Sequence, residues 1–219
     1  MQIDKIGSRN IIFSHIDIEE WNCDLNLHLI IGKNRNYIID TGFGSESIEP
    51  IKEYLSGNYK PIIVINTHSD WDHIWGNHCF RNSIIISHKL CRGLIEEHWT
   101  ETLIDYKQFI RGEVIQCLPN LLIEDTIYFP DDEVRIFYTP GHTVDCISVF
   151  DEHDNVLNVG DNIGDTISEI VPEINTDKAT YIQTIQKYKS LNIEACISGH
   201  NKILGQEIFD KIIETLGSK

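Results

Sequence analysis

The sequence has no apolar stretch that approaches the roughly 18 residues a helix needs to cross a membrane. Residues 1–10 are polar and lack the apolar core of a secretory signal peptide. No stretch is enriched in proline, glycine or serine, so the composition marks no linker. We therefore expect a cytoplasmic protein with no membrane association, built as one α/β domain over residues 1–219.

Basic residues are scarce, because 18 Lys and Arg face 34 Asp and Glu, giving a formal net charge of -16. Such an excess of negative charge repels phosphate backbones at long range. We therefore expect a small-molecule substrate and no nucleic-acid partner. The sequence leaves the oligomeric state open, with a homodimer as one option.

The six cysteines form no C-x-x-C pair and are widely scattered along the chain. Neither a disulfide scaffold nor a cysteine-rich metal site has such spacing. We expect buried free thiols, none of which is needed as a metal ligand.

The densest group of metal-ligand residue types lies in the run Thr67-His68-Ser69-Asp70-Trp71-Asp72-His73, directly after an apolar, strand-like stretch. In an extended segment residues i and i+2 point the same way, so His68 and Asp70 can face one ion. Asp72 and His73 follow where the chain turns toward a helical pattern, and can face a second ion. A single aspartate here would also suit a helix N-terminus. The four together predict a metal site.

Three further ligand-type residues each follow an apolar strand-like run and a glycine. They are His142 in Pro140-Gly141-His142-Thr143, Asp161 after Gly160, and His200 after Gly199. Glycine lets the backbone turn sharply and bring the next side chain into a crowded centre. The repetition at strand ends predicts that these side chains join the first group.

In this order the residues resemble the metallo-β-lactamase fold superfamily, whose pattern is H-x-H-x-D-H followed by a His, an Asp or Cys, and a last His. The resemblance covers nearly the whole chain and places Asp40 at the family's usual structural position. It implies an α/β fold, an αββα four-layer sandwich of two mixed β-sheets with outer helices. It also implies a binuclear metallohydrolase.

The resemblance implies a division of the ligands between two metal ions. His68, Asp70 and His142 would hold the first ion and Asp72, His73 and His200 the second, with Asp161 bridging them. Asp72 would also be catalytic, orienting the nucleophile and passing a proton to the leaving group.

One position departs from the family pattern, because Asp70 stands where most members have a second histidine. A carboxylate shifts a site toward harder, oxygen-preferring ions, so iron or manganese compete with zinc as the expected pair of divalent metals. The flavodiiron branch also carries a carboxylate there, as H-x-E-x-D-H, and it binds iron and reduces oxygen or nitric oxide.

Three functions stay open on this sequence. The first is a hydrolase that uses a metal-bound hydroxide on a small ester, thioester, lactone or related substrate. The second is a di-iron oxidoreductase resembling the flavodiiron core, with electrons from a separate chain. The third is a non-catalytic, metal-stabilised binding domain.

Local patterns also predict the secondary structure. Short β-branched or aromatic runs bounded by Gly, Asn, Asp or Pro predict strands at 11–16, 25–31, 36–40, 62–66, 84–87, 126–129, 134–138, 146–150, 155–159 and 195–198. Helical patterns occur at 45–55, 72–80, 89 to about 117, 176–191 and 206–216. By resemblance, residues 89–120 would form a helical cap insertion over the substrate pocket.

Overall fold

The structure, a computed structural model, describes residues 1–18 and 23–217 and contains two β-sheets. The first sheet has seven strands in the order β1-β2-β3-β4-β5-β6-β7. Its strands are β1 (Gln2–Ile6), β2 (Asn10–Ile18), β3 (Cys23–Ile31), β4 (Asn36–Ile39), β5 (Ile62–Ile65), β6 (Ile84–His88) and β7 (Leu121–Ile123). Strands β1 to β4 pair antiparallel, whereas β4 to β7 pair parallel, so the sheet is mixed.

The second sheet has five strands in the order β12-β11-β10-β9-β8. They are β8 (Thr126–Phe129), β9 (Val134–Tyr138), β10 (Ile147–Asp151), β11 (Val156–Asn158) and β12 (Ala195–Ile197). Strands β8 to β11 pair antiparallel, and β12 adds parallel to β11. Both sheets are therefore mixed, as expected.

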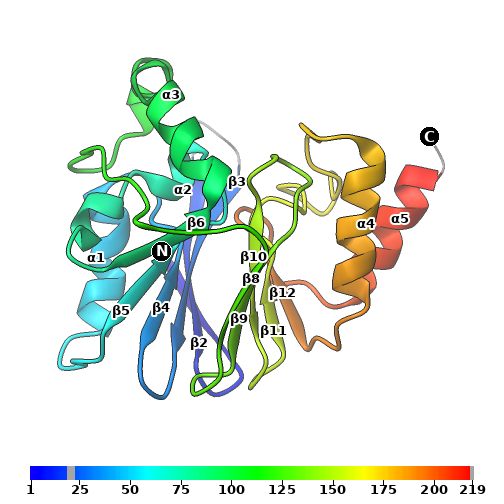
Figure 1. Cartoon of the computed structure of the whole chain (residues 1–219), viewed down its shortest axis with the longest axis horizontal. Helices are drawn as coiled ribbons and strands as arrows, with labels where there is room; N and C mark the ends of the chain where they lie inside the picture. The colour runs from blue at the N-terminus through cyan, green and yellow to red at the C-terminus, as the bar shows by residue number, and fades with distance from the viewer. Residues whose placement is uncertain (19–22, 218–219) are drawn as a thin grey trace.

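The helices lie outside the two facing sheets, with α1 and α3 on one side and α4 and α5 on the other (Figure 1). Their bounds are α1 (Ser45–Tyr54), α2 (Trp71–Ile74), α3 (Lys89–Asp105), α4 (Lys178–Lys189) and α5 (Glu207–Gly217), with 3-10 turns η1 (Asn77–Phe80) and η2 (Lys107–Phe109). This is the αββα sandwich that the resemblance implies, and that prediction is confirmed.

Alternation along the central strands explains the layers. In β4, Tyr37 and Ile39 belong to the apolar cluster between the sheets, whereas Ile38 joins the cluster beneath α1 and α3. Successive side chains of a strand point to opposite faces, so a strand covered on both faces is apolar throughout. The two sheets therefore pack on each other and on their helices at once.

The helix predicted over 72–80 is wrong, because the chain forms only the four-residue α2 and then η1. Gly76 separates the two, and a Cβ at this position would lie 2.3 Å from the Thr41 carbonyl oxygen. The Trp75 amide donates to the carbonyl of Gly42, so the backbone packs against the loop after β4. That close packing replaces a continuous helix.

The helix predicted from Lys89 to about Cys117 ends earlier, at Asp105. The chain beyond it pairs with the start of α1, since the amide of Arg111 donates to the Phe43 carbonyl and Ser45 donates to that of Glu113. Gly112 has φ +75°, which a helix does not contain. Tertiary pairing therefore overrides the helical pattern after α3.

Two strands were not predicted from the sequence. β1 carries polar residues on an exposed edge, and its pairing with β2 defines it. β7 has three residues and adds parallel to β6. Both segments are strands because they pair with a neighbouring strand, and a local sequence pattern does not reveal that pairing.

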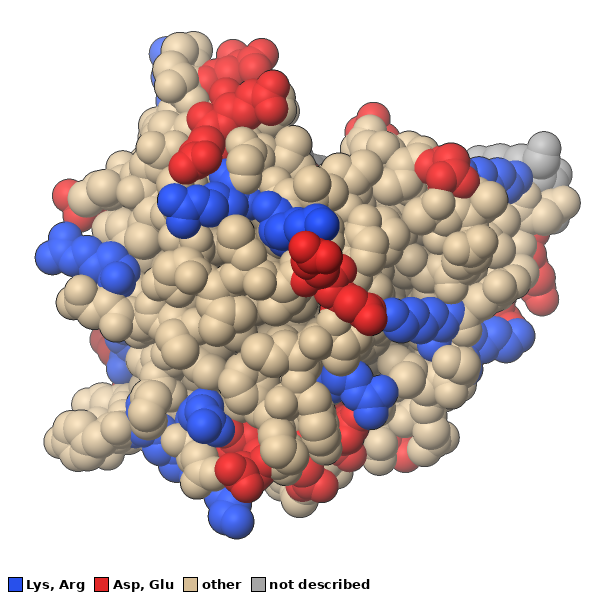
Figure 2. Space-filling view, viewed as in Figure 1, with Lys and Arg blue, Asp and Glu red and all other residues tan. Residues whose placement is uncertain are grey.

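The face drawn in Figure 2 has no single large patch of one charge: acidic side chains gather over the upper part of α3, and acidic and basic side chains alternate below it.

All described cysteines are free thiols. Cys91, Cys146 and Cys196 are buried, whereas Cys79 and Cys117 are half-buried, and the side chain of Cys23 lies outside the described part. No helix in residues 1–18 and 23–217 is long and apolar enough to span a membrane.

Candidate metal centre

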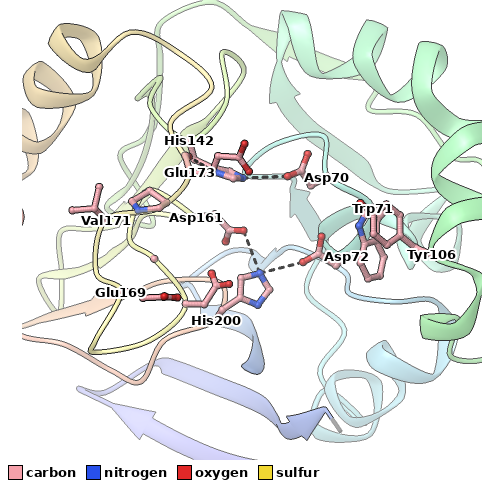
Figure 3. A pocket seen from close by; sticks show the side chains of 13 residues that line it. Asp70, Trp71, Asp72, Tyr106, His142, Asp161, Glu169, Val171, Glu173 and His200 are labelled. Atoms are coloured by element: carbon pink, nitrogen blue, oxygen red, sulfur yellow. Dashed lines mark hydrogen bonds and ion pairs between the residues drawn. The ribbon is translucent and has the colours of Figure 1, made fainter. Parts of the chain in front are cut away.

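The seven predicted ligand residues meet at one end of the sandwich, after strands of both sheets. Figure 3 shows five of them: Asp70, Asp72, His142, Asp161 and His200. His68 and Asp70 lie in the loop after β5, and Asp72 and His73 on the short helix α2. The remaining three come from the other sheet: His142 follows β9, Asp161 follows β11 and His200 follows β12. Strand ends of two sheets thus supply one compact cluster.

The first group consists of His68, Asp70 and His142, whose ligand-type atoms lie within 4.8 Å of one another. The Oδ2 atom of Asp70 is 3.3 Å from Nε2 of His68 and 3.2 Å from Nε2 of His142. Asp70 therefore occupies the position between two imidazoles that the family pattern gives to a histidine.

The second group consists of Asp72, His73, Asp161 and His200, all of them buried. Nε2 of His73 and Nε2 of His200 each lie 3.1 Å from Oδ2 of Asp72. The same two nitrogens each lie 3.2 Å from Oδ2 of Asp161. Two imidazoles and two carboxylates therefore converge on one point.

Asp161 connects the two groups. Its Oδ2 atom also lies 3.6 Å from Nε2 of His68 in the first group. The structure thus brings together all seven residues in the division that the resemblance implies, with Asp161 between the groups. That these residues bind metal stays a prediction.

The Nδ1 atoms of two of the histidines, which point away from the cluster, each form a hydrogen bond with the backbone. Nδ1 of His200 donates to the carbonyl oxygen of Asp24 and Nδ1 of His142 to that of Glu173, both at 2.8 Å. A carbonyl only accepts, so each Nδ1 carries the proton and each Nε2 presents its lone pair when the ring is neutral. Such contacts fix the tautomer that a metal ligand needs.

Asp40 orders both histidines of the first loop. Its Oδ2 atom accepts from Nδ1 of His73 at 2.8 Å and from the Thr67 hydroxyl at 2.7 Å, and that hydroxyl lies 3.0 Å from Nδ1 of His68. Asp40 has φ +62°, a left-handed conformation that aspartate tolerates better than most residues. Its carboxylate is thereby turned under the loop that carries the ligands.

Two glycines beside ligands have the role expected of them. Gly160 has φ +54°, and a Cβ there would lie 2.8 Å from Cβ of Thr67. A Cβ on Gly199 would lie 2.2 Å from Oδ1 of Asp161 and 2.8 Å from a ring carbon of His73. The ligand loops can approach this closely only without side chains at both positions.

Buried polar atoms without hydrogen-bond partners support the fit of this cluster to metal ions. Of the ten such atoms in the described residues, four belong to the two groups: His68 Nε2, His73 Nε2, Asp72 Oδ2 and Asp161 Oδ1. Burying such atoms without a partner is costly. Divalent ions would satisfy lone pairs on imidazole nitrogen and carboxylate oxygen together.

The ligand groups shift one another's pKa values. Burial raises the pKa of Asp161, but the charges of His73 and His200 outweigh burial and hold it well below its usual value. Burial lowers the pKa of His142, but its hydrogen bond to Asp70 and the charge of Asp161 raise it to about 9. Protons therefore compete with metal ions for this cluster.

A cavity of about 340 Å³ opens above the cluster. Asp72, Asp161 and His200 line its floor, while Trp71 and Tyr106 line one side, stacked with ring centres 4.6 Å apart (Figure 3). The opposite side is lined by residues 164–173 (Figure 3). A small molecule can therefore reach the ligand residues.

The sequence profile of the metallo-beta-lactamase superfamily matches residues 23–200. The chain belongs to this superfamily. Over 146 residues it is 27% identical to the "Probable metallo-hydrolase" of Methanocaldococcus jannaschii, covering 66% of this chain and 59% of that protein. It is 25% identical to the bovine (Bos taurus) acyl-coenzyme A thioesterase MBLAC2, covering 62% of this chain and 57% of the relative. The chain thus spans just under three fifths of the length of these two curated relatives.

Solved structures of the superfamily share the fold. A metallo-beta-lactamase from Pontibacter korlensis superposes with a TM-score of 0.79 at 17% identity, covering 100% of this chain and 99% of that one. The DIM-1 metallo-beta-lactamase gives a TM-score of 0.76 at 17% identity, covering 99% and 97%. At such identity the likeness shows the fold alone.

The sequence did not predict most of the residues that line the sides of the cavity, which we call its wall. Trp71 lines the cavity and also packs on Phe43 and Phe109. Trp75 is fully buried in the core. The run of residues 164–173 has no local signal, because only the tertiary structure brings it over the ligands.

Proposed function

We propose that this chain is a binuclear metallohydrolase that cleaves a small ester, thioester, lactone or related carbonyl compound. The observation that carries the proposal is the convergence of the seven ligand-type residues, four of them with unpartnered buried atoms and five of them lining a cavity. Its membership of the superfamily supports the same reaction class.

The protein's own side chains would prepare the site. Nδ1 contacts to backbone carbonyls hold Nε2 of His142 and His200 toward the cavity, so no ring has to turn when a ligand binds. Bound divalent ions would act as Lewis acids and lower the pKa of water toward about 7, which makes a protein nucleophile unnecessary.

Asp72 is the residue we assign to proton transfer. It is 3% exposed, lines the cavity, and places Oδ2 3.1 Å from Nε2 of both His73 and His200. A second carboxylate oxygen is available to accept a proton from the attacking water and later deliver it to the leaving oxygen or sulfur.

The substrate class rests on the chemistry of the site and on the relatives. One relative bears the name acyl-coenzyme A thioesterase, and another the name metallo-hydrolase. A thioester and an ester present the same carbonyl to an activated water, so both belong to the first panel to be tried.

A second function is favoured by Asp70. Its carboxylate replaces a neutral imidazole between His68 and His142 and adds negative charge beside the first group. That change favours harder ions such as iron, and with it a di-iron oxidoreductase that takes electrons from a partner. Oxygen consumption with a reduced flavin or rubredoxin donor, at a rate above ester turnover, would establish this function.

The deciding experiment is turnover of chromogenic esters, thioesters and lactones by protein loaded with zinc, manganese or iron. We expect His142→Ala to abolish turnover, because it removes one predicted ligand. His98→Ala is the matched control, since His98 lies exposed on α3 outside the cavity. Equal turnover in wild type and His142→Ala would refute the proposal.

A further inference from the structure

The cavity wall combines unpaired carboxylates with an aromatic pair. Asp165, Glu169 and Glu173 line it, and none belongs to the two groups that could hold a metal. Among the residues that the structure describes, no Lys or Arg lines the cavity, and none forms an ion pair with these three side chains. Their charge is therefore available to a ligand.

The charge balance stays negative even when the centre is loaded. Three carboxylates on the wall and three among the ligands, Asp70, Asp72 and Asp161, line the same cavity. Two divalent ions would offset four of these six charges. The remaining excess lies on the wall, where Glu173 is beside His142 and Glu169 beside His200 (Figure 3). There it would meet the part of a substrate remote from its carbonyl.

The cavity has a buried polar floor beneath its exposed acidic wall. Asp72 and Asp161 are 3% and 7% exposed and line its floor, and each has a buried carboxylate oxygen without a hydrogen-bond partner. Those unpartnered atoms mark the floor as the place where a ligand binds. The wall carboxylates surround the path to it.

Trp71 and Tyr106 complete the wall on the side opposite Glu169 and Val171 (Figure 3). Trp71 is 7% exposed and stacks on Phe43, Phe109 and Tyr106, so the accessible ring is that of Tyr106, which is 39% exposed. Aromatic rings attract cations through their negative faces. Aromatic rings combined with carboxylates suit a group that is both cationic and partly apolar.

We propose that the cavity selects substrates that carry a cationic ammonium group, such as amino or quaternary ammonium esters and thioesters. This inference rests on the proposed hydrolase function for the reaction and adds the substrate's charge. Carboxylate or phosphate groups next to the scissile bond would be repelled by the wall and disfavoured.

The test uses pairs of ligands that differ in charge and share their shape. In S-butyrylthiocholine a quaternary nitrogen stands where S-(3,3-dimethylbutyl) thiobutyrate has a carbon. We expect zinc-loaded protein to prefer the cation about threefold to tenfold in kcat/KM, as weak, partly exposed charge contacts provide. Glu169→Gln combined with Glu173→Gln should bring that preference close to one.

The control variant removes the same number of negative charges as the Glu169→Gln, Glu173→Gln variant, but at positions away from the cavity. Glu96 and Glu97 lie exposed on α3, and neither lines the cavity. Glu96→Gln with Glu97→Gln should therefore keep the wild-type preference. A preference lost in both double variants would reflect long-range charge and would overturn the assignment to the wall.

Binding without turnover gives a second readout. Choline and its carbon isostere 3,3-dimethylbutan-1-ol each give one sharp methyl NMR signal, whose broadening on titration with zinc-loaded protein reports binding. We expect choline to bind more tightly to wild type and to lose that advantage in the Glu169→Gln, Glu173→Gln variant. Equal binding of both compounds to wild type overturns the inference.

The outcomes separate the two proposals. Hydrolysis of both thioesters at equal rates would leave the hydrolase function intact and refute selection for a cation. Preferential binding of choline without turnover of any ester, thioester or lactone of the panel would refute the hydrolase function and support the cation site.

Discussion

The carboxylates on the floor and on the wall of one cavity have opposite surroundings. Asp72 and Asp161 on the floor are buried and each contacts at least two imidazoles, whereas Glu169 and Glu173 on the wall are exposed and have no basic partner among the described residues. Burying charge is costly unless strong partners are present. The surroundings of the floor are therefore compatible with bound metal ions, whereas the wall carboxylates are open to a ligand.

The largest difference between floor and wall should appear in Asp161→Asn. Loss of the carboxylate between the two groups should remove at least one metal ion and lower kcat/KM on the order of a thousandfold. Metal analysis of the purified protein and ester kinetics measure both effects. Asp165→Asn, four residues away on the wall, should keep the full metal content. Equal metal content in the two variants would break the distinction between floor and wall.

A smaller effect is expected one contact away from the floor, in Asp40→Asn. The carboxylate accepts from the His73 ring and the Thr67 hydroxyl with one oxygen and from the Thr67 backbone amide with the other, whereas an amide would turn its NH2 toward one of these donors. Metal affinity should therefore fall about tenfold to a hundredfold. Competition with a chelator of known affinity measures the change. An unaltered affinity would show that the ring needs no such support.

The floor should also respond to pH, because protons compete with metal there. The pKa of His142 is raised to about 9, so its ring is protonated near neutrality after metal is removed and must lose that proton when metal binds. Metal affinity should rise about fiftyfold between pH 7 and 9, because the deprotonated fraction of this ring rises from about one hundredth to about one half. Calorimetry in two buffers of different ionisation enthalpy should show proton release.

The same raised pKa predicts the opposite trend for stability after chelation. The ion pair of His142 with Asp70 stabilises the folded chain fully below the unfolded pKa of about 6.5, and this contribution is lost as pH rises through about 9. Chelated protein should therefore unfold more readily at pH 9 than at pH 6.5. A thermal scan showing no such loss would argue against this ion pair.

The smallest effect on the floor concerns Asp70→His, which restores the more common ligand. Removing one negative charge should make the bound metals stronger Lewis acids and shift the pH optimum of hydrolysis down by about one unit. The pH profile of kcat/KM at fixed metal content measures the shift. Identical profiles for the variant and the wild type would contradict the role given to Asp70.

The floor could be predicted from sequence, whereas the wall could not. Four of the ligand-type residues lie within six positions of one another, in the loop after β5 and on α2: His68, Asp70, Asp72 and His73. The other three each follow a strand and a glycine: His142, Asp161 and His200. Local sequence patterns therefore predict where these seven residues lie. Glu169 and Glu173 lie in residues without a repeating pattern, and Tyr106 reaches the cavity only because the chain turns at the end of α3.

The sandwich was predictable for a related reason, since its strands alternate or are apolar throughout. The helical pattern after Asp105 was overruled by pairing of residues 111–113 with the start of α1. The cytoplasmic location, the single domain with a cap over 89–120, the oligomeric state, the small-molecule substrate and the expected absence of nucleic-acid and membrane partners stay predictions.

The central claim is that the seven converging side chains form a binuclear metal centre. Its most direct test is the metal content of protein expressed with iron, manganese and zinc supplied together, compared with the Asp70→Ala variant. The account predicts about two ions per wild-type chain and fewer in the variant. Two iron ions would favour the redox function over hydrolysis. Less than a tenth of an ion per wild-type chain, unchanged when metal is added back, would contradict the account.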